Sequence, residues 1–221
     1  EKKDIKAASL RKSVGTLISL ANGRKALKVR VLLDSFLTET VPTEETAKIF
    51  TEISFLASYK FTEYKTKKKD DPPKAPESIE LVTEKKDLVS SLHATLVRAE
   101  KIAKAVLFAR DLNNEPGNVM NPPRLAEEAK KLAAAKKVEC KVLGLTELKK
   151  MGMNGILAVN QGSVTPPVLI IMEYGKEHKE KGTVCLVGKG VTFDTGGISI
   201  KPSKGMEEMK YDKSGAIAVI A

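Results

Sequence analysis

Short apolar segments in the second half of the chain constrain its fold more than any other feature. Segments such as VLIIM are apolar at nearly every position, unlike a strand that exposes one face to water. Strands of this kind are usually buried on both faces of a largely parallel sheet that helices cover. Helical patterns at 124–136 and 145–151 accompany them, which indicates an α/β fold. The predicted strands are 138–143, 156–160, 167–173 and 183–188.

The amino-terminal part of the chain predicts a smaller α/β domain. Apolar residues recur at helical spacing over 3–22, where Asn22-Gly23 ends the pattern, and again over 43–60. The segments 27–34 and 78–82 have the pattern of strands. We therefore expect a small α/β domain over 1–85.

A long helix is predicted over 86–112. Its apolar stripe recurs every three or four residues and consists of Leu88, Leu92, Leu96, Ala99, Ala103, Val106 and Leu107. The turn-rich segment NNEPGNVMNPP, residues 113–123, ends the pattern. We expect this helix to link the domain at 1–85 to a second domain that begins at residue 113 and continues to 221.

The net charge of +10 raises the question of an anionic partner. The lysines are spread along helical faces and interleaved with glutamates, and only KTKKKDD at 65–71 is dense. We interpret 65–71 as a solvated loop, because it includes two aspartates and is followed by the proline-rich PPKAP. No aromatic residue interleaves with its basic residues, which disfavours a platform for stacking single-stranded nucleic acid. A nucleic-acid surface is the disfavoured alternative.

Several features favour a soluble protein of the reducing cytosol with no membrane partner. No apolar run approaches the roughly 18 residues of a membrane span, and the charged start EKKDIKAASLRK is unlike a secretory signal peptide. Cys140 and Cys185 each lie in an apolar, strand-like segment, which disfavours a disulfide framework. His93 falls on the long helix and His178 in a loop, so we expect neither to bind a metal.

The glycine-dense segment GKGVTFDTGGISIK, residues 188–201, is the strongest candidate for function. It begins where the predicted strand TVCLVG ends, and ligands bind at the carboxyl ends of strands in parallel sheets. A phosphate cradle is disfavoured, because neither G-x-G-x-x-G nor G-x-x-x-x-G-K-[ST] matches. A purely structural turn explains the glycines but leaves the charges unexplained. A metal site explains both, since carboxylates at Asp194 and Asp212 can bind a divalent cation beside a basic side chain.

Two stretches of the chain resemble the leucyl aminopeptidase family, the cytosolic dinuclear-zinc M17 peptidases. The residues VGKGVTFDTGGISIKPSKGMEEMKYDKSGA resemble its metal-binding segment. The residues ARDLNNEPGNVMNPPRLAEEAKKL resemble its linker into the catalytic domain. The resemblance implies an α/β protein in three parts: a partial amino-terminal α/β domain at 1–85, a linking helix at 86–112, and the first part of a metallopeptidase catalytic domain with a largely parallel central sheet at 113–221.

The resemblance also implies a role for five residues. Lys189 would donate a neutral amine to one metal, Asp194 would bridge two metals, and Asp212 would bind the same metal as Lys189. Lys201 would stay charged, polarise the scissile carbonyl and stabilise the gem-diolate intermediate. Met209 would help to line the pocket for the side chain at the substrate's amino terminus.

The implied activity is removal of amino-terminal residues, leucine and other apolar residues foremost, from peptides by a metal-activated water. The implied cofactors are two divalent metal ions, Zn²⁺ first and Mn²⁺, Mg²⁺ or Co²⁺ as alternatives, with a bicarbonate in the complete site. The implied partners are peptides with a free amino terminus and five further copies of the chain in a cytoplasmic homohexamer.

Two departures from the family pattern qualify this expectation. The family's second metal-binding block, Asn-Thr-Asp-Ala-Glu-Gly-Arg, does not occur in the sequence. The resemblance therefore predicts a middle portion of a longer enzyme, inactive as a 221-residue segment by itself. A catalytically inactive fragment or pseudoenzyme that serves as an interaction protein is the alternative. The second departure is Lys213-Ser214, where relatives commonly have Met and a small residue; Lys213 should point about 100° around a helix from Asp212.

Overall fold

The computed structural model describes residues 5–66, 76–136 and 138–221. The chain forms two compact units, Glu1–Phe108 and Ala109–Ala221. The boundary falls inside a single helix, α3 (Lys86–Asn114), whose existence the apolar stripe predicts correctly. The predicted division at 85 and 112 remains a prediction. Most of the lysine-rich segment 65–71 lies outside the described residues.

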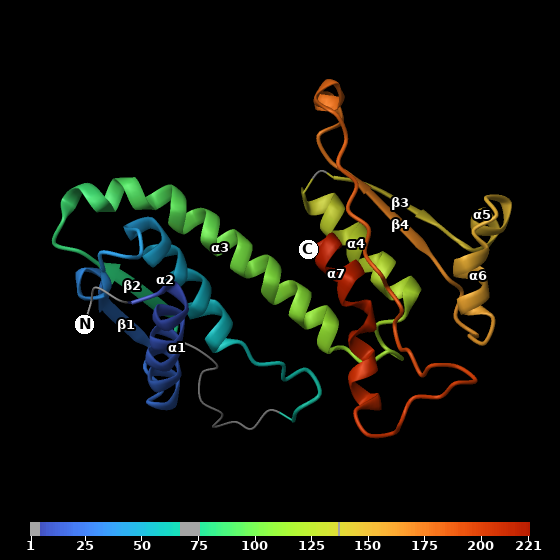
Figure 1. Ribbon diagram of the computed structural model, residues 1–221, viewed down its shortest axis with the longest axis horizontal. Helices are drawn as coiled ribbons and strands as arrows, with labels where there is room; N and C mark the ends of the chain where they lie inside the picture. The colour runs from blue at the N-terminus through green and yellow to red at the C-terminus, as the bar shows by residue number, and fades with distance from the viewer. Residues whose placement is uncertain (1–4, 67–75, 137) are drawn as a thin grey trace. The chain divides into compact units, whose positions relative to one another are not determined.

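The first unit pairs two helices with a two-stranded parallel sheet (Figure 1). Strands β1 (Lys28–Leu32) and β2 (Ser78–Val82) run in register from Lys28 beside Ser78 to Leu32 beside Val82. Helices α1 (Ala7–Gly23) and α2 (Thr43–Ser58) pack on each other, and the short 3₁₀ helix η2 (Leu33–Phe36) follows β1. The sequence pattern predicts both helices and both strands, and α1 ends at the predicted Gly23.

The core of the first unit forms because apolar residues on α1 and α2 face each other. Leu10, Val14 and Ile18 recur every four residues on α1, which places them on one face of the helix. At the edge of this contact Arg11 forms ion pairs with Glu45 at 3.2 Å and with Glu52 at 3.1 Å. The buried core consists of Leu10, Val14, Ile18, Val31, Leu33, Val41, Ala47, Ile49, Phe50 and Leu92.

The second unit contains a two-stranded antiparallel sheet with helix α4 against it (Figure 1). Strand β3 (Glu139–Leu143) pairs with β4 (Leu169–Glu173), from Glu139 beside Glu173 to Leu143 beside Leu169. The other elements are α4 (Pro122–Lys136), α5 (Leu145–Lys150), α6 (Asn154–Asn160), η3 (Lys176–Lys181), η4 (Met206–Lys213) and α7 (Ser214–Ile220).

The α/β class, the amino-terminal α/β domain and the long helix are confirmed, but the strands of the second unit differ from the prediction. The predicted strand 156–160 is part of helix α6, since short apolar runs fit either structure. The predicted strand 183–188 has no regular secondary structure and pairs with no described strand, and Val184 and Val187 are exposed. The described strands are parallel in the first unit and antiparallel in the second. Apolar composition does not encode strand direction, so the sequence pattern could not predict this difference.

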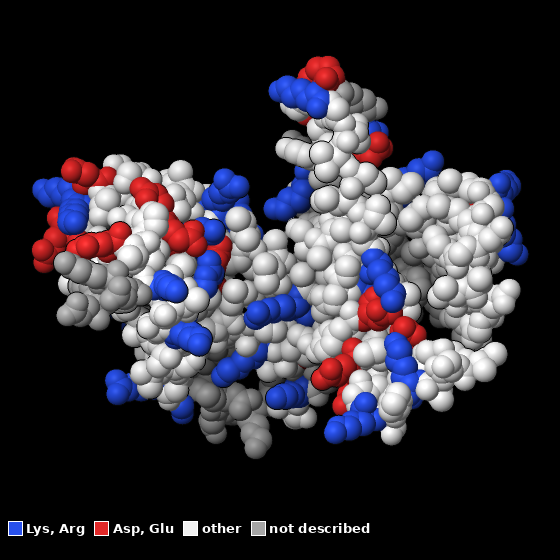
Figure 2. All heavy atoms as spheres, viewed as in Figure 1, with Lys and Arg blue, Asp and Glu red and all other residues white. Residues whose placement is uncertain are grey.

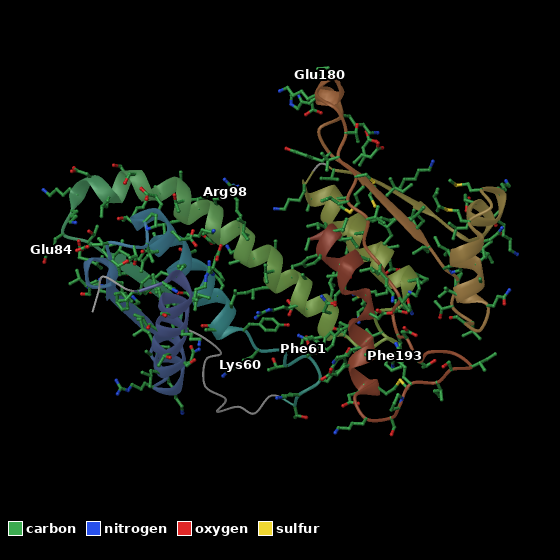
Figure 3. All side chains as sticks on the ribbon, viewed as in Figure 1. Lys60, Phe61, Glu84, Arg98, Glu180 and Phe193 are labelled. Carbon is green, nitrogen blue, oxygen red and sulfur yellow. The ribbon has the colours of Figure 1, made fainter. Side chains whose placement is uncertain are left out.

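No helix in the described part of the chain is long and apolar enough to cross a membrane. On the face shown in Figure 2, acidic and basic side chains are intermixed. The charged tip of η3, where Figure 3 labels Glu180, stands away from the β3–β4 sheet of its own unit.

Candidate active site

Glycines bring the segment after residue 187 into contact with the start of α7. A Cβ atom at Gly188 would overlap the backbone of Gly215 and Ala216, so only glycine allows this approach. A Cβ at Gly215 would likewise lie 2.9 Å from the Lys189 nitrogen. The Ala216 N–H donates to the Lys189 carbonyl at 2.7 Å. The backbone that carries Lys189 is therefore fixed against the helix that follows Asp212.

A second pair of glycines turns the chain between Asp194 and Lys201. Gly196 and Gly197 have φ of 88° and 73°, a left-handed conformation that side chains with a Cβ rarely adopt. The Lys201 N–H donates to the Thr195 carbonyl at 2.9 Å, which closes the turn. Phe193, labelled in Figure 3, lies just before this turn. The turn returns Lys201 to the carboxylate of Asp194.

Asp194 and Lys201 form the first ion pair of the site. Lys201 Nζ lies 2.7 Å from Asp194 Oδ2 and donates also to the Asp194 carbonyl at 3.2 Å. The Gly196 N–H donates to Asp194 Oδ1 at 2.9 Å. The hydrogen bond from Lys201 lowers the pKa of Asp194, and the Gly196 N–H lowers it further against the opposing effect of burial. The Met209 sulfur lies 3.2 Å from Lys201 Nζ, so the predicted pocket residue is beside the predicted catalytic lysine.

Lys189 and Asp212 form the second ion pair, with Nζ 2.9 Å from Oδ2. The Lys189 side chain is 61% exposed, whereas that of Asp212 is 22% exposed. The hydrogen bond to Asp212 raises the pKa of Lys189 despite partial desolvation, and the charges of Asp212 and Asp194 raise it further. The electrostatic effect of Asp194 on Lys189 couples the two ion pairs into one site.

The donor atoms of this site fit a divalent cation. Asp212 Oδ2 is buried and, apart from the ion pair with Lys189, has no hydrogen bond of good geometry among the described residues. The described residues contain no group of three or more His, Cys, Asp and Glu that could hold a metal ion, so the candidate donors are two carboxylates and a lysine amine. Carboxylate oxygens are favoured ligands of hard divalent cations, and each carboxylate here already holds a positive group.

Sequence reasoning missed a set of contacts that anchors the turn around Asp212. Tyr211 Oη donates to Asn114 Oδ1 at 3.0 Å, and Lys210 Nζ donates to the Asn114 carbonyl at 3.2 Å. Lys213 is fully buried and also reaches the end of α3, so it does not enter the site. Two features of the sequence could have pointed to these contacts: the asparagine pair in NNEPGN and the departure from the family pattern at Lys213-Ser214. Neither feature shows that the two segments contact each other.

Burial lowers the pKa of Lys213 to about 8; the nearby charge of Lys210 adds to this effect and that of Glu115 opposes it. The side chain is therefore still mostly protonated at neutral pH. A buried ammonium requires hydrogen-bond acceptors, and the structure supplies backbone carbonyls.

Known proteins similar to this chain point to one family. The model of the cytosol aminopeptidase family, catalytic domain, matches residues 107–221, and that of the family's N-terminal domain matches residues 1–68. A relative from Roseiflexus castenholzii named "Probable cytosol aminopeptidase" is 44% identical over 83% of this chain and 37% of its own length. One of the same name from Bacillus subtilis is 42% identical over 86% of this chain and 37% of its own length.

Among solved structures, "Bottromycin maturation enzyme BotP in complex with Mn" is similar, with a TM-score of 0.80 and 28% identity. The similarity covers 99% of this chain and 44% of that one. The chain thus spans well under half the length of the relatives it matches. Both family models and the curated relatives agree with the resemblance of the glycine-dense segment to the aminopeptidase family. The chain therefore belongs to the cytosol aminopeptidase family.

Proposed function

We propose that the full-length protein containing this chain is a metal-dependent aminopeptidase that removes leucine and other apolar residues from the amino terminus of peptides. The observation that carries this proposal is the pair of lysine–carboxylate contacts, Lys189 with Asp212 and Lys201 with Asp194, inside the family's catalytic domain. The substrates are peptides with a free amino terminus.

Lys189, Asp194 and Asp212 would hold two divalent cations together with groups outside this chain. Zn²⁺ is the proposed metal, with Mn²⁺, Mg²⁺ and Co²⁺ as alternatives, because such donor sets accept several divalent ions. The similar bottromycin maturation enzyme, whose structure was solved in complex with Mn, supports a divalent ion in this fold. When bound, the ions supply Lewis acidity that activates water and polarises the peptide carbonyl.

The two lysines must play opposite roles. Lys189 can act as a ligand only as a neutral amine, whereas its contact with Asp212 favours the charged form. Loading of the site must therefore remove a proton from Lys189 and break its ion pair with Asp212.

Lys201 would act on the substrate as an ammonium. Its contact with Asp194 directs Nζ toward the carboxylate that would bridge the metals, so the positive charge is oriented before the reaction. Such a charge lowers the barrier when negative charge develops on the carbonyl oxygen. Met209, in contact with Lys201, would provide an apolar surface for the substrate's first side chain.

The remaining groups of the proposed enzyme would lie outside this chain. These are two further carboxylate ligands and the arginine that holds a bicarbonate general base, all in the second metal-binding block. We propose that the complete protein is a cytoplasmic homohexamer, and we expect the 221-residue segment alone to be inactive.

Hydrolysis of a leucyl chromogenic amide by the full-length protein tests this function. Activity should require Zn²⁺, Mn²⁺, Mg²⁺ or Co²⁺, should disappear with a chelator and should return when metal is added. Lys201→Met should lower kcat by about 10²-fold to 10³-fold with little change in metal content. Lys204→Met, which alters an exposed lysine of the same segment, is the matched control. Absence of hydrolysis with every one of these metals would refute the proposed activity.

A further inference from the structure

Lys213 has its three donors directed at three backbone carbonyls. Its Nζ donates to the carbonyls of Lys210 at 2.6 Å, Glu115 at 2.9 Å and Asn113 at 3.3 Å. The side chain is 0% exposed, which is rare for lysine. A lysine ammonium has three N–H donors and no acceptor, so three carbonyls satisfy it completely.

The Asn113 carbonyl belongs to the last turn of α3 (Lys86–Asn114), and the Glu115 carbonyl directly follows the helix. The last carbonyls of a helix have no partner within the helix and carry a partial negative charge. A buried cation is favourable there, so Lys213 joins the end of α3 to the turn of η4. The third carbonyl, that of Lys210, belongs to η4 itself and fixes the conformation of the turn.

Residues on both sides of Asp212 in the sequence also bond to the end of α3. Tyr211 Oη donates to Asn114 Oδ1, and Ser214 Oγ lies 2.9 Å from Asn113 Oδ1. Asp212 is thus held between residues that are attached to the end of α3. The opposite partner, Lys189, is fixed separately through its carbonyl by the Ala216 N–H at the start of α7.

We propose that Lys213 is a positioning residue that holds the Asp212 carboxylate at the metal site by joining η4 to residues 113–115. The inference rests on the proposed function, in which Asp212 is a ligand. Lys213 would not touch the metal or the substrate. Its removal would allow the turn to move, and Asp212 would no longer be held opposite Lys189.

The experiment compares Co²⁺ binding to the metal-free full-length protein and to its Lys213→Met variant, which replaces the ammonium by an apolar side chain of similar length. Calorimetry gives the affinity, and the visible absorption of bound Co²⁺ reports its coordination geometry. Lys213→Met should bind Co²⁺ about tenfold to 100-fold more weakly, with an altered spectrum. Lys204→Met is the matched control, because it alters an exposed lysine of the same segment that takes no part in these contacts, and it should bind Co²⁺ nearly as the wild type does.

Wild-type affinity and spectrum in a folded Lys213→Met variant would overturn the proposal. A lower melting temperature with unchanged Co²⁺ binding would show that Lys213 only stabilises the fold, and would overturn it equally. If Lys213→Met does not fold, Lys213→Gln, which retains two donors, is judged by the same two measurements. Asp212→Asn separates the two proposals: unchanged Co²⁺ binding in that variant would reject Asp212 as a ligand, whatever Lys213 does.

Discussion

Lys189 and Lys201 have different surroundings although they lie within one short segment, and the proposed function gives them different roles. Lys201 is half-buried and contacts Asp194 through both its carboxylate and its carbonyl, and the Met209 sulfur lies beside it. Lys189 is mostly exposed and has a single carboxylate partner in Asp212. The more exposed lysine can exchange its partner more readily, which suits a ligand, whereas the more enclosed one is suited to remain an oriented charge.

Metal binding should release a proton from Lys189. In the metal-free protein the hydrogen bond to Asp212 raises the pKa of Lys189 above its usual value, so the amine is protonated at neutral pH. Because the ligand form is neutral, the apparent metal affinity should rise with pH, by about tenfold per unit for one proton. Calorimetric titration with Zn²⁺ in buffers of different ionisation enthalpy measures the number of protons released.

The Lys189→Met variant is the control for this experiment, since its side chain cannot titrate. It should release about one proton fewer than the wild type and bind Zn²⁺ more weakly. An equal release of protons by both proteins would show that Lys189 keeps its proton and is not a ligand.

The sequence names the residues of the candidate site, but it does not show which side chains they contact. Lys189, Asp194, Lys201, Met209 and Asp212 were identified through the resemblance of one continuous segment, and the structure brings Lys201 to Asp194 and Lys189 to Asp212. The contacts of Lys213 with Asn113 and Glu115 join segments about a hundred residues apart. Local patterns contain no information on such pairs.

At the scale of elements, the site depends on close contact between the segment at 188–190 and the start of α7. Gly188 and Gly215 lie back to back, and the hydrogen bond from Ala216 to Lys189 joins the two backbones. A side chain at Gly188 would have to push rigid backbone apart, unlike one that meets the end of a flexible side chain.

Gly188→Ala should therefore destabilise the full-length protein by about 1–3 kcal/mol and weaken metal binding, because α7 must move away from Lys189. Gly155→Ala is the matched control: Gly155 lies in α6 with no atom near its Cβ position, and alanine should be neutral or stabilise the helix by up to about 1 kcal/mol. Urea unfolding gives both values. If Gly188→Ala unfolds at the same urea concentration as the wild type, the backbone contact is not needed for stability.

The elements show where sequence patterns were sufficient. Amphipathic spacing identified α1, α2 and α3 because each buries one stripe, for example Leu10, Val14 and Ile18 of α1. The pattern failed for GILAV, which is helical in α6, because an apolar run of five residues fits a strand or a helix equally well. Whether such a run forms a strand depends on a neighbouring strand to pair with, and that strand lies elsewhere in the chain.

At the scale of the whole chain, the first unit includes part of the long helix. Leu92 of α3 belongs to the buried core with only 3% of its surface exposed, and Leu88 and Leu96 pack against that core. A domain that ended at residue 85 would lack all three side chains. The unit that ends at Phe108 contains them, so we expect the amino-terminal domain to extend to about residue 108.

Urea unfolding of two fragments of the full-length protein, both beginning at the protein's own amino terminus and ending at residue 85 or at residue 108, tests this boundary. The longer fragment should unfold cooperatively. The shorter one should be unfolded, or its free energy of unfolding should be lower by several kcal/mol, since burying each leucine contributes about 1.5–3 kcal/mol. Within the longer fragment, Leu92→Ala should cost about 2–5 kcal/mol. Val89→Ala on the same helix should cost much less, because Val89 is 66% exposed. Equal stability of the two fragments would place the boundary at 85, and α3 would then be a separate linker whose burial of Leu92 adds nothing to the amino-terminal domain.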